Sequence, residues 1–535
     1  MAELYCNLPP TVRLTNVIAL ALSCVALTAT AQNTNTNATR SLSLRDALAE
    51  GLRKNLDVQI ERYNTVIARF TLESALGAWD PAFTFQASHR YDDSPSYFAV
   101  DKLNQDFPYK ADTDTLGPGI SGKLPTGLLY DLSAKSVGIN NARTDFTGAS
   151  DFATEFAKGP SGKYFDFPGG IRTSNFYYLD AGITIRQPLL RNAWIDLTRQ
   201  QIKVARKNQQ ISEVAFRALA IKVATDIQLA YYELVYGREN VKVQQVALQT
   251  ATQFRDETVK RVKAGELTDL DQQAAQSRVE TVQSDLLLAQ QLYIEQQNAL
   301  KQMLSDDFNQ WRDTEIVPTE DLIALPEHPN RMEIVENALT KRPDILQMKL
   351  QLERQGIIVK FNYNQLFPTF DIIASGGMHA GNASFGAAAD DLSDINHPYY
   401  SVGAILTIPF TFKAERNAYK ASQALQDQLI LRMRKLENDA YVQVDTAAKV
   451  LESAFKQVSS RRAARETAQA ALDAEQKKAA AGVTTSFFVL ERQSLATAAR
   501  SAEIRALADY NKARAQLYYN EGTTLEKNMI ILETK

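Results

Sequence analysis

The sequence predicts an internally duplicated, mainly α-helical protein in which long helical hairpins are joined to short amphipathic strands. Two observations carry this prediction. The chain repeats itself, because residues 51–83 align without a gap on residues 338–370, and residues 199–300 align on residues 416–517. Each copy also contains a tract without proline that is long enough for roughly 100 Å of helix. A tandem duplication of this kind requires a fold with internal pseudo-symmetry.

The N-terminus has the pattern of an export signal. Arg13 precedes an apolar run, Val17–Leu27, and the run is followed by an A-x-A motif at residues 29–31. This arrangement is typical of a cleaved signal peptide, here residues 1–31. A lipoprotein signal, with Cys24 as the acylated residue, is the alternative.

Composition excludes several classes of protein. The formal net charge of −3 over 535 residues gives no reason to expect a nucleic-acid partner. Cys6 and Cys24 are the only cysteines, so the mature chain is expected to have neither a disulfide nor a thiolate metal site. Beyond residue 31, no stretch approaches the ~18 apolar residues that a membrane helix needs. An exported chain of this kind is periplasmic, secreted, or inserted in the outer membrane as strands.

The first repeat, residues 42–304, is predicted to follow a flexible leader over residues 32–41. It begins with a helix over residues 44–78. The strand that follows, residues 82–88, alternates apolar and polar side chains, and so does a returning strand over residues 179–186. Strands of an outer-membrane barrel have this period, with apolar side chains toward lipid. An amphipathic sheet lying on a soluble core is the alternative.

A long helical hairpin follows the returning strand, with its tip near Gly265. Its return arm carries apolar residues at alternating steps of four and three, a period of 3.5 residues that specifies a left-handed supercoil. The second repeat, residues 334–520, has the same order, with a tip near Gly482. The proline-rich segment between the repeats, residues 305–333, is predicted to form an equatorial patch with the C-terminal tail, residues 521–535.

The repeats differ in the connection between their strands. The first is predicted to have a long surface loop over residues 90–175, and the second a short loop over residues 377–398. Two strand-like segments within the long loop, residues 116–124 and 128–135, have the pattern of a further hairpin. This hairpin either joins the wall of strands or stands above it, and the second arrangement is favoured.

The order and spacing of these elements resemble the TolC-like outer-membrane efflux protein family. The resemblance rests on a strand that begins with Pro-x-Phe at Pro81, a second strand that ends in Gln187–Leu190, a hairpin that turns at Ala-Gly, and the repetition of the whole. It covers residues 42 to about 520. The resemblance implies a homotrimer in which each protomer gives four strands to a shared β-barrel and its coiled-coil helical hairpins to a periplasmic tunnel. It also implies a passive exit duct in the outer membrane, in contact with outer-membrane lipid. The duct would serve a tripartite efflux or type I secretion system, docked to a periplasmic adaptor (membrane fusion) protein and an inner-membrane pump.

Two other classes of function are weighed against this one. The four histidines have no metal-ligand spacing, and the only G-x-G-x-x-G match, Gly117–Gly122, lies between strand-like segments and does not open a helix. The chain is therefore not expected to be an enzyme or to hold a cofactor or metal. The remaining alternative is a periplasmic coiled-coil adaptor or scaffold without a membrane barrel. Adaptors of that kind normally have one hairpin and an inner-membrane anchor, whereas this chain has two hairpins and no anchor.

Candidate functional residues lie at the two hairpin tips. In the resembling family, carboxylates six and nine residues beyond the second tip glycine can ring the closed mouth of the channel; here those positions are Phe488 and Glu491, and Asp271 stands six residues beyond the first tip glycine. The pore-constriction candidates are Asp271, Phe487, Phe488 and Glu491. The adaptor-docking candidates are Lys263, Gly265, Lys478 and Gly482. The alternative is that the carboxylates are solvated helix charges and the glycines serve only the turns. The sequence identifies neither the exported substrate nor the class of pump.

Overall fold

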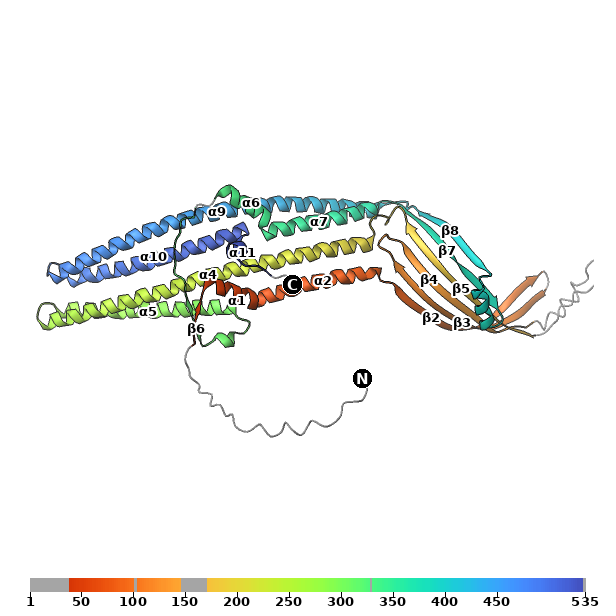
Figure 1. Cartoon of the computed structure of the whole chain (residues 1–535), viewed down its shortest axis with the longest axis horizontal. Coiled ribbons are helices and arrows are strands. Elements are labelled where there is room, and N and C mark those ends of the chain that lie inside the picture. Colours follow the sequence, from red (N-terminus) through yellow and green to blue (C-terminus); the bar gives the residue numbers. More distant parts are fainter. Residues whose placement is uncertain (1–37, 101–102, 146–170, 328–329, 533–535) are drawn as a thin grey trace, which may run out of the picture.

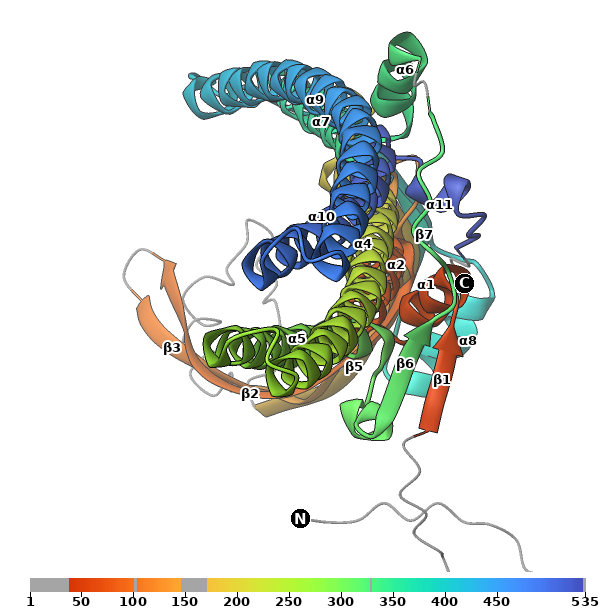
Figure 2. The same cartoon turned by 90° about the vertical axis from the view of Figure 1, so that its left-hand side faces the viewer.

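The computed structural model describes residues 38–100, 103–145, 171–327 and 330–532. The predicted signal peptide and residues 32–37 of the predicted leader lie outside the described residues. The molecule is elongated, with one β-sheet at one end and the tips of two helical hairpins at the other (Figure 1). Seen from the tips, the long helices lie side by side along an arc that is open on one side (Figure 2).

Four helices form the two hairpins. The first pairs α4 (Leu197–Lys263) with α5 (Asp269–Leu304), and the second pairs α9 (Lys413–Ala480) with α10 (Ser486–Glu521). The absence of proline lets each long arm continue without a break. The predicted seam of α5 is confirmed, because its apolar residues are buried at Ala275, Val282, Leu286, Ala289 and Leu300. In the described part of the chain, no helix is long and apolar enough to cross a membrane.

Shorter helices connect the hairpin region to the sheet. The predicted helix over residues 44–78 is wrong in its continuity, because α1 (Leu44–Lys54) ends and α2 (Leu56–Leu76) begins at Asn55. The Asn55 side chain accepts hydrogen bonds from the backbone N–H groups of the first turn of α2, which makes it an N-cap. The second repeat breaks at the equivalent place, where α6 (Arg331–Lys341) gives way to α7 (Pro343–Asn364). A proline at the first position of a helix replaces a donor that would have no partner there. A short 3-10 turn, η1 (Gly77–Trp79), leads from α2 to the sheet.

Within the described residues, the sheet has six antiparallel strands in the order β2-β3-β4-β5-β7-β8. The prediction of four strands is therefore wrong in number. The strands are β2 (Ala82–Val100), β3 (Leu103–Lys123), β4 (Leu129–Asp145), β5 (Ile171–Pro188), β7 (Thr369–Asn382) and β8 (Pro398–Thr407).

The two additional strands come from the predicted long loop. The hairpin over residues 116–135 pairs with both neighbouring strands and lies inside the sheet, so the prediction that it stands above the sheet is wrong. The predicted loop over residues 90–175 is strand in most of its described part, and residues 146–170 lie outside the described residues. The predicted loop over residues 377–398 is also shorter, because β7 continues to Asn382 and α8 (Phe385–Ser393) follows it.

The sheet has one apolar and one more polar face. One face exposes apolar side chains from all six strands, among them Phe83, Ile120, Leu132, Ile183, Ile372 and Val402. The opposite face includes Gln86, Lys135, Asp180 and the hydrogen-bonded pair Ser375 and Ser401. This distribution follows from the period of two of a β-strand. It confirms the amphipathic strands that the sequence predicts.

A small parallel sheet marks the equator of the molecule. It pairs β1 (Ala38–Leu42) with β6 (Thr314–Pro318), so the end of the predicted leader is a strand. The main hydrophobic core lies beneath it and includes Leu42, Leu48, Ile227, Leu300 and Ile316. Residues of the C-terminal tail after α11 (Thr524–Lys527) pack against the same core.

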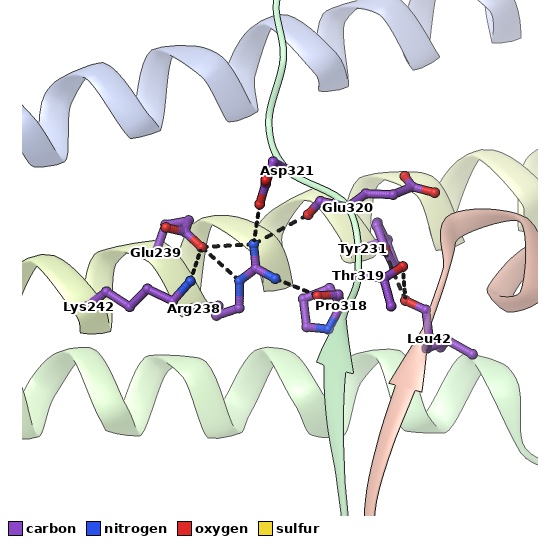
Figure 3. A network of polar contacts seen from close by, with 9 residues as sticks. All are labelled: Leu42, Tyr231, Arg238, Glu239, Lys242, Pro318, Thr319, Glu320 and Asp321. Atoms are coloured by element: carbon purple, nitrogen blue, oxygen red, sulfur yellow. Dashed lines mark hydrogen bonds and ion pairs between the residues drawn. The ribbon is translucent and has the colours of Figure 1, made fainter.

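Polar contacts fasten this equatorial segment to α4 (Figure 3). The Tyr231 hydroxyl donates to the Leu42 carbonyl at 3.0 Å. The Arg238 guanidinium donates to the Pro318 carbonyl and pairs with Asp321 at 3.0 Å and Glu239 at 2.8 Å. The segment between the repeats is therefore held against the first hairpin by backbone carbonyls as well as by charge.

Candidate functional site

The two hairpin tips lie together at the end of the molecule farthest from the sheet (Figure 1). Each tip reverses the chain at a glycine in the left-handed region, with φ of 79° at Gly265 and 74° at Gly482. Hydrogen bonds from the glycine N–H and from the next N–H return to carbonyls of the last helical turn. This pattern is the Schellman motif, which a residue without a side chain adopts at least cost. The predicted turns at both glycines are confirmed.

The first tip continues into α5 through a capping box. The Thr268 side chain accepts a hydrogen bond from the Asp271 N–H at 3.3 Å, and the Asp271 carboxylate accepts from the Thr268 N–H at 3.1 Å and its hydroxyl at 2.7 Å. The Thr268 side chain and backbone, with a smaller contribution from Ser486, hold the pKa of Asp271 below its ordinary value. Asp271, a constriction candidate, therefore has a structural task in this chain.

The second tip has no such box. Thr485 is the N-cap residue of α10, but its side chain makes no capping hydrogen bond. Instead, the Thr484 hydroxyl donates to the Glu475 carboxylate of α9 and holds the pKa of Glu475 below its ordinary range. At the position that corresponds to Asp271 stands Phe488, which cannot accept a hydrogen bond.

The remaining candidates are exposed on the tips. Phe487 is 68% exposed and Phe488 46% exposed, and their rings meet edge to face with centroids 5.6 Å apart. Glu491 is also exposed, one turn further along α10. The docking candidates Lys263, Gly265, Lys478 and Gly482 are all exposed, and Lys478 pairs with Glu475 at 3.3 Å. A side-chain β-carbon added at either tip glycine would meet no other atom within 4 Å.

Contacts between the two hairpins occur at the tips and again near the equator. At the tips, Arg261 of the first hairpin donates to the Ala479 carbonyl of the second at 3.4 Å. Near the equator, Glu233 of α4 pairs with Arg505 at 3.1 Å and Lys512 at 2.7 Å, both from α10. Between these two contacts, the hairpins line a partly open pocket of about 300 Å³.

Sequence reasoning missed several of these residues. The capping box had a signal, because Thr268 and Asp271 fit the pattern of Ser or Thr followed three residues later by an acidic residue. The ion pairs of Glu233 had none, because their partners lie in the other repeat. Within the residues that the structure describes, no group of three or more His, Cys, Asp or Glu side chains is arranged to hold a metal ion.

Comparison with known proteins finds sequences that resemble this chain. Residues 334–522 match the family model described as "Outer membrane efflux protein". This match covers the second repeat of the chain. It is 24% identical over 380 residues to the pyoverdine export outer membrane protein OpmQ of Pseudomonas aeruginosa, covering 70% of this chain and 71% of that protein.

Solved structures of outer-membrane channels share the fold. The Campylobacter jejuni CmeC outer membrane channel superimposes with a TM-score of 0.60 at 14% identity, covering 90% of this chain and 86% of that one. The outer membrane protein VceC of Vibrio cholerae superimposes with a TM-score of 0.61 at 15% identity, covering 90% and 96%. The predicted TolC-like fold class is confirmed. The family match, the export relative and the shared channel fold together identify the chain as an exit duct of the outer membrane that extends into the periplasm.

Proposed function

We propose that three copies of this chain assemble into one continuous passive conduit across the outer membrane and the periplasm. The observation that carries the proposal is that neither the sheet nor the arc of helices is closed within a single copy. Among the residues that the structure describes, β2 and β8 are edge strands with no partner on one side, and the helices form an arc rather than a closed ring (Figure 2). Neighbouring copies would pair the sheet edges and extend the arc into a tube.

The apolar face of the sheet supports insertion in a membrane. Large apolar side chains such as Phe83 and Val402, 70% and 75% exposed, would be solvated if the sheet lay in water. In an outer-membrane barrel the same side chains face lipid, and the more polar face lines the lumen. This face separates the conduit from a periplasmic scaffold without a barrel.

The tips are the part of the conduit that would meet other proteins. They lie farthest from the sheet and expose both charged and apolar residues, including Lys263, Leu270, Lys478, Val483 and Phe487. We assign to them the docking of a periplasmic adaptor, which in turn holds an inner-membrane pump. The family works as a conduit with such partners, and the chain itself is proposed to have no catalytic step.

The same end would carry the narrowest part of the duct. Three-fold symmetry would bring three copies of Glu491 and of the Phe487–Phe488 pair near one axis. A ring of carboxylates attracts cations, and a ring of phenylalanines can block ions by dewetting. Because the Asp271 carboxylate already holds the cap of α5, Glu491 is assigned the larger electrostatic role.

The mass of the native particle tests the assembly. Before extraction, the protein is expected to fractionate with outer membranes. After extraction in detergent, it is expected to give the mass of three chains in native mass spectrometry. Chemical cross-linking of the same sample should stop at three copies. A stable monomer that keeps its folded sheet in detergent would contradict the proposal.

A further inference from the structure

We infer that the insertion in the first repeat widens the membrane barrel, so that three copies close eighteen strands instead of twelve, with β2 of one copy paired to β8 of the next. The inference rests on the proposed trimer. Each copy contributes a six-stranded sheet, and three such sheets make eighteen strands. The two strands beyond the four of the duplicated plan are β3 and β4.

The inserted hairpin is a full part of the sheet. β3 pairs with β2 in one register over the whole length of β2, from Ala82 opposite Ser121 to Val100 opposite Leu103. β4 pairs with β5 from Leu129 opposite Arg186 to Asp145 opposite Ile171, with one irregularity. β2 and β5, which correspond to the adjacent strands β7 and β8 of the second repeat, are therefore separated by two strands.

The apolar face crosses the insertion without a gap. A shallow apolar groove of about 470 Å³ runs over five strands and is lined by Phe83, Ile120, Leu132, Ile183 and Met378. Ile120 and Leu132 belong to the inserted hairpin and are 42% and 50% exposed. Above the membrane, these side chains would meet water, which is unfavourable in proportion to the apolar surface that they expose. Within the barrel wall, they meet lipid.

The hairpin is also anchored where the sheet meets the helices. Its tight turn is closed by hydrogen bonds between Leu124 and Leu128 and between Gly127 and Leu124, with Gly127 at a φ of 90°. Beside the turn, the Lys123 ammonium pairs at 2.8 Å with Asp196, the buried N-cap residue of α4. The insertion therefore begins at the same level as the other strands.

The strand directions allow closure between copies. β2 runs away from the helices and β8 runs toward them, so β2 of one copy and β8 of the next are antiparallel. An even number of antiparallel strands is the rule for bacterial single-chain barrels, and the same alternation of direction lets three copies close without a mismatch. The partner that fits each open edge is a second copy of this chain.

A wider barrel changes where cargo is selected. Barrel diameter grows roughly linearly with strand number, so eighteen strands give about 1.5 times the diameter of twelve, and barrels of this size leave an aqueous channel. The arrangement of long helices has gained no corresponding element, because both ends of the insertion lie in the sheet. The barrel would then set no size limit, and the helical tunnel and its tips would select the cargo.

Engineered disulfides test the strand order in the intact protein. The predicted mature chain has no cysteine, and directly opposite residues of antiparallel strands lie about 4.5–5.5 Å apart at Cα, which a disulfide can span. Two pairs are opposite in the six-stranded order: Ser88→Cys with Thr115→Cys, and Asp131→Cys with Thr184→Cys. The matched control is Thr84→Cys with Thr184→Cys. These two residues correspond by repeat alignment to Asp371 and Ile405, which are opposite each other in the second repeat.

The trimer is oxidised, denatured and labelled with a maleimide–polyethylene glycol, and a reduced sample reports the full labelling. For the two cysteine pairs that are opposite in the six-stranded order, labelling is expected to fall at least fivefold on oxidation. The control pair is expected to stay fully labelled. Protection of the control pair with full labelling of the other two would overturn the inference and leave the trimer in place. A native mass of one chain would overturn the trimer and with it the closed barrel, while the three cysteine pairs would still decide the strand order.

Discussion

The two hairpin tips have the same type of backbone turn and differ in the residues that follow it. Both reverse at a glycine through the same pair of hydrogen bonds. After Gly265 the chain enters α5 through the Thr268–Asp271 capping box, whereas after Gly482 it enters α10 without a side-chain cap and presents Phe487 and Phe488.

This difference shows which part of a duplicated element is constrained by folding. The turn is kept in both copies because only a residue tolerant of positive φ can end a helix in this way. The first turn of the return helix has diverged, toward local stability in one copy and toward exposed aromatic side chains in the other. We therefore expect the first tip to be sensitive to loss of its cap and the second to loss of its aromatic surface.

The largest effect is expected from substitutions of the shared glycines. The double variant Gly265→Val, Gly482→Val places β-branched residues at positive φ, at about 1–2 kcal/mol or more per site. Because an added β-carbon meets no atom within 4 Å, the strain stays local and the trimer is expected to survive. Export of a reporter substrate should be abolished, with unchanged native mass.

An asparagine pair separates the turn from the docking surface. Asn tolerates the left-handed region, so Gly265→Asn, Gly482→Asn keeps the turn while adding a side chain to each tip. If the tips dock an adaptor, export should fall in this variant too; full export would assign the glycines to the turn alone. Gly356→Ala, in α7 with open space around it, is the matched control and should leave export unchanged.

The aromatic tip is tested next by single-channel recording in planar bilayers. Phe488→Ala should raise conductance because it removes bulk from the proposed constriction. Glu491→Gln should lower cation selectivity more than Asp271→Asn does, because the Asp271 carboxylate is engaged by Thr268. Glu280→Gln, an exposed carboxylate further along α5, should leave both quantities unchanged. Wild-type conductance and reversal potential in all three tip variants would place the constriction elsewhere.

Apart from the fold class, which the duplication and the order of elements predict, the features predicted correctly from the sequence depend on residues within one segment. The seam of α5 and the turns at Gly265 and Gly482 follow from residue spacing within one segment. The position of the inserted hairpin could not be predicted, because Leu116–Leu124 has the same alternation inside a sheet or above it. Only its pairing with β2 and β5 decides.

The site was predicted less completely than the fold. The distance of Asp271 from the tip glycine predicts a pore residue, and the structure adds a local partner, the Thr268 hydroxyl three residues earlier. The contact of Glu233 with Arg505 and Lys512 joins residues more than 270 positions apart, and no pattern in either segment indicates it. Long-range contacts of this kind depend on how the repeats pack.

A smaller effect should separate the two caps. Thr268→Ala removes the capping box and is expected to cost about 1 kcal/mol of local helix stability, whereas Thr485→Ala removes no hydrogen bond and should cost close to none. Hydrogen exchange measured by mass spectrometry on peptides that cover each tip reports local opening. Exchange should become roughly fivefold faster at the first tip for Thr268→Ala. Equal effects at the two tips would contradict the proposed asymmetry.

The smallest effect concerns the pH dependence of the first cap. The Thr268 hydrogen bonds hold the pKa of Asp271 below its ordinary value of 3.8, so the carboxylate stabilises the tip above that pH and loses this contribution as the pH falls through the lowered pKa. Hydrogen exchange of the first tip, corrected for intrinsic rates, should therefore show the same difference between wild type and Asp271→Asn from pH 8 to about 5. The difference should shrink only below pH 3.8, and the second tip, whose equivalent residue is Phe488, should show no difference between these two proteins at any pH. A difference that disappears already near pH 6 would show that another group, and not Asp271, controls the cap.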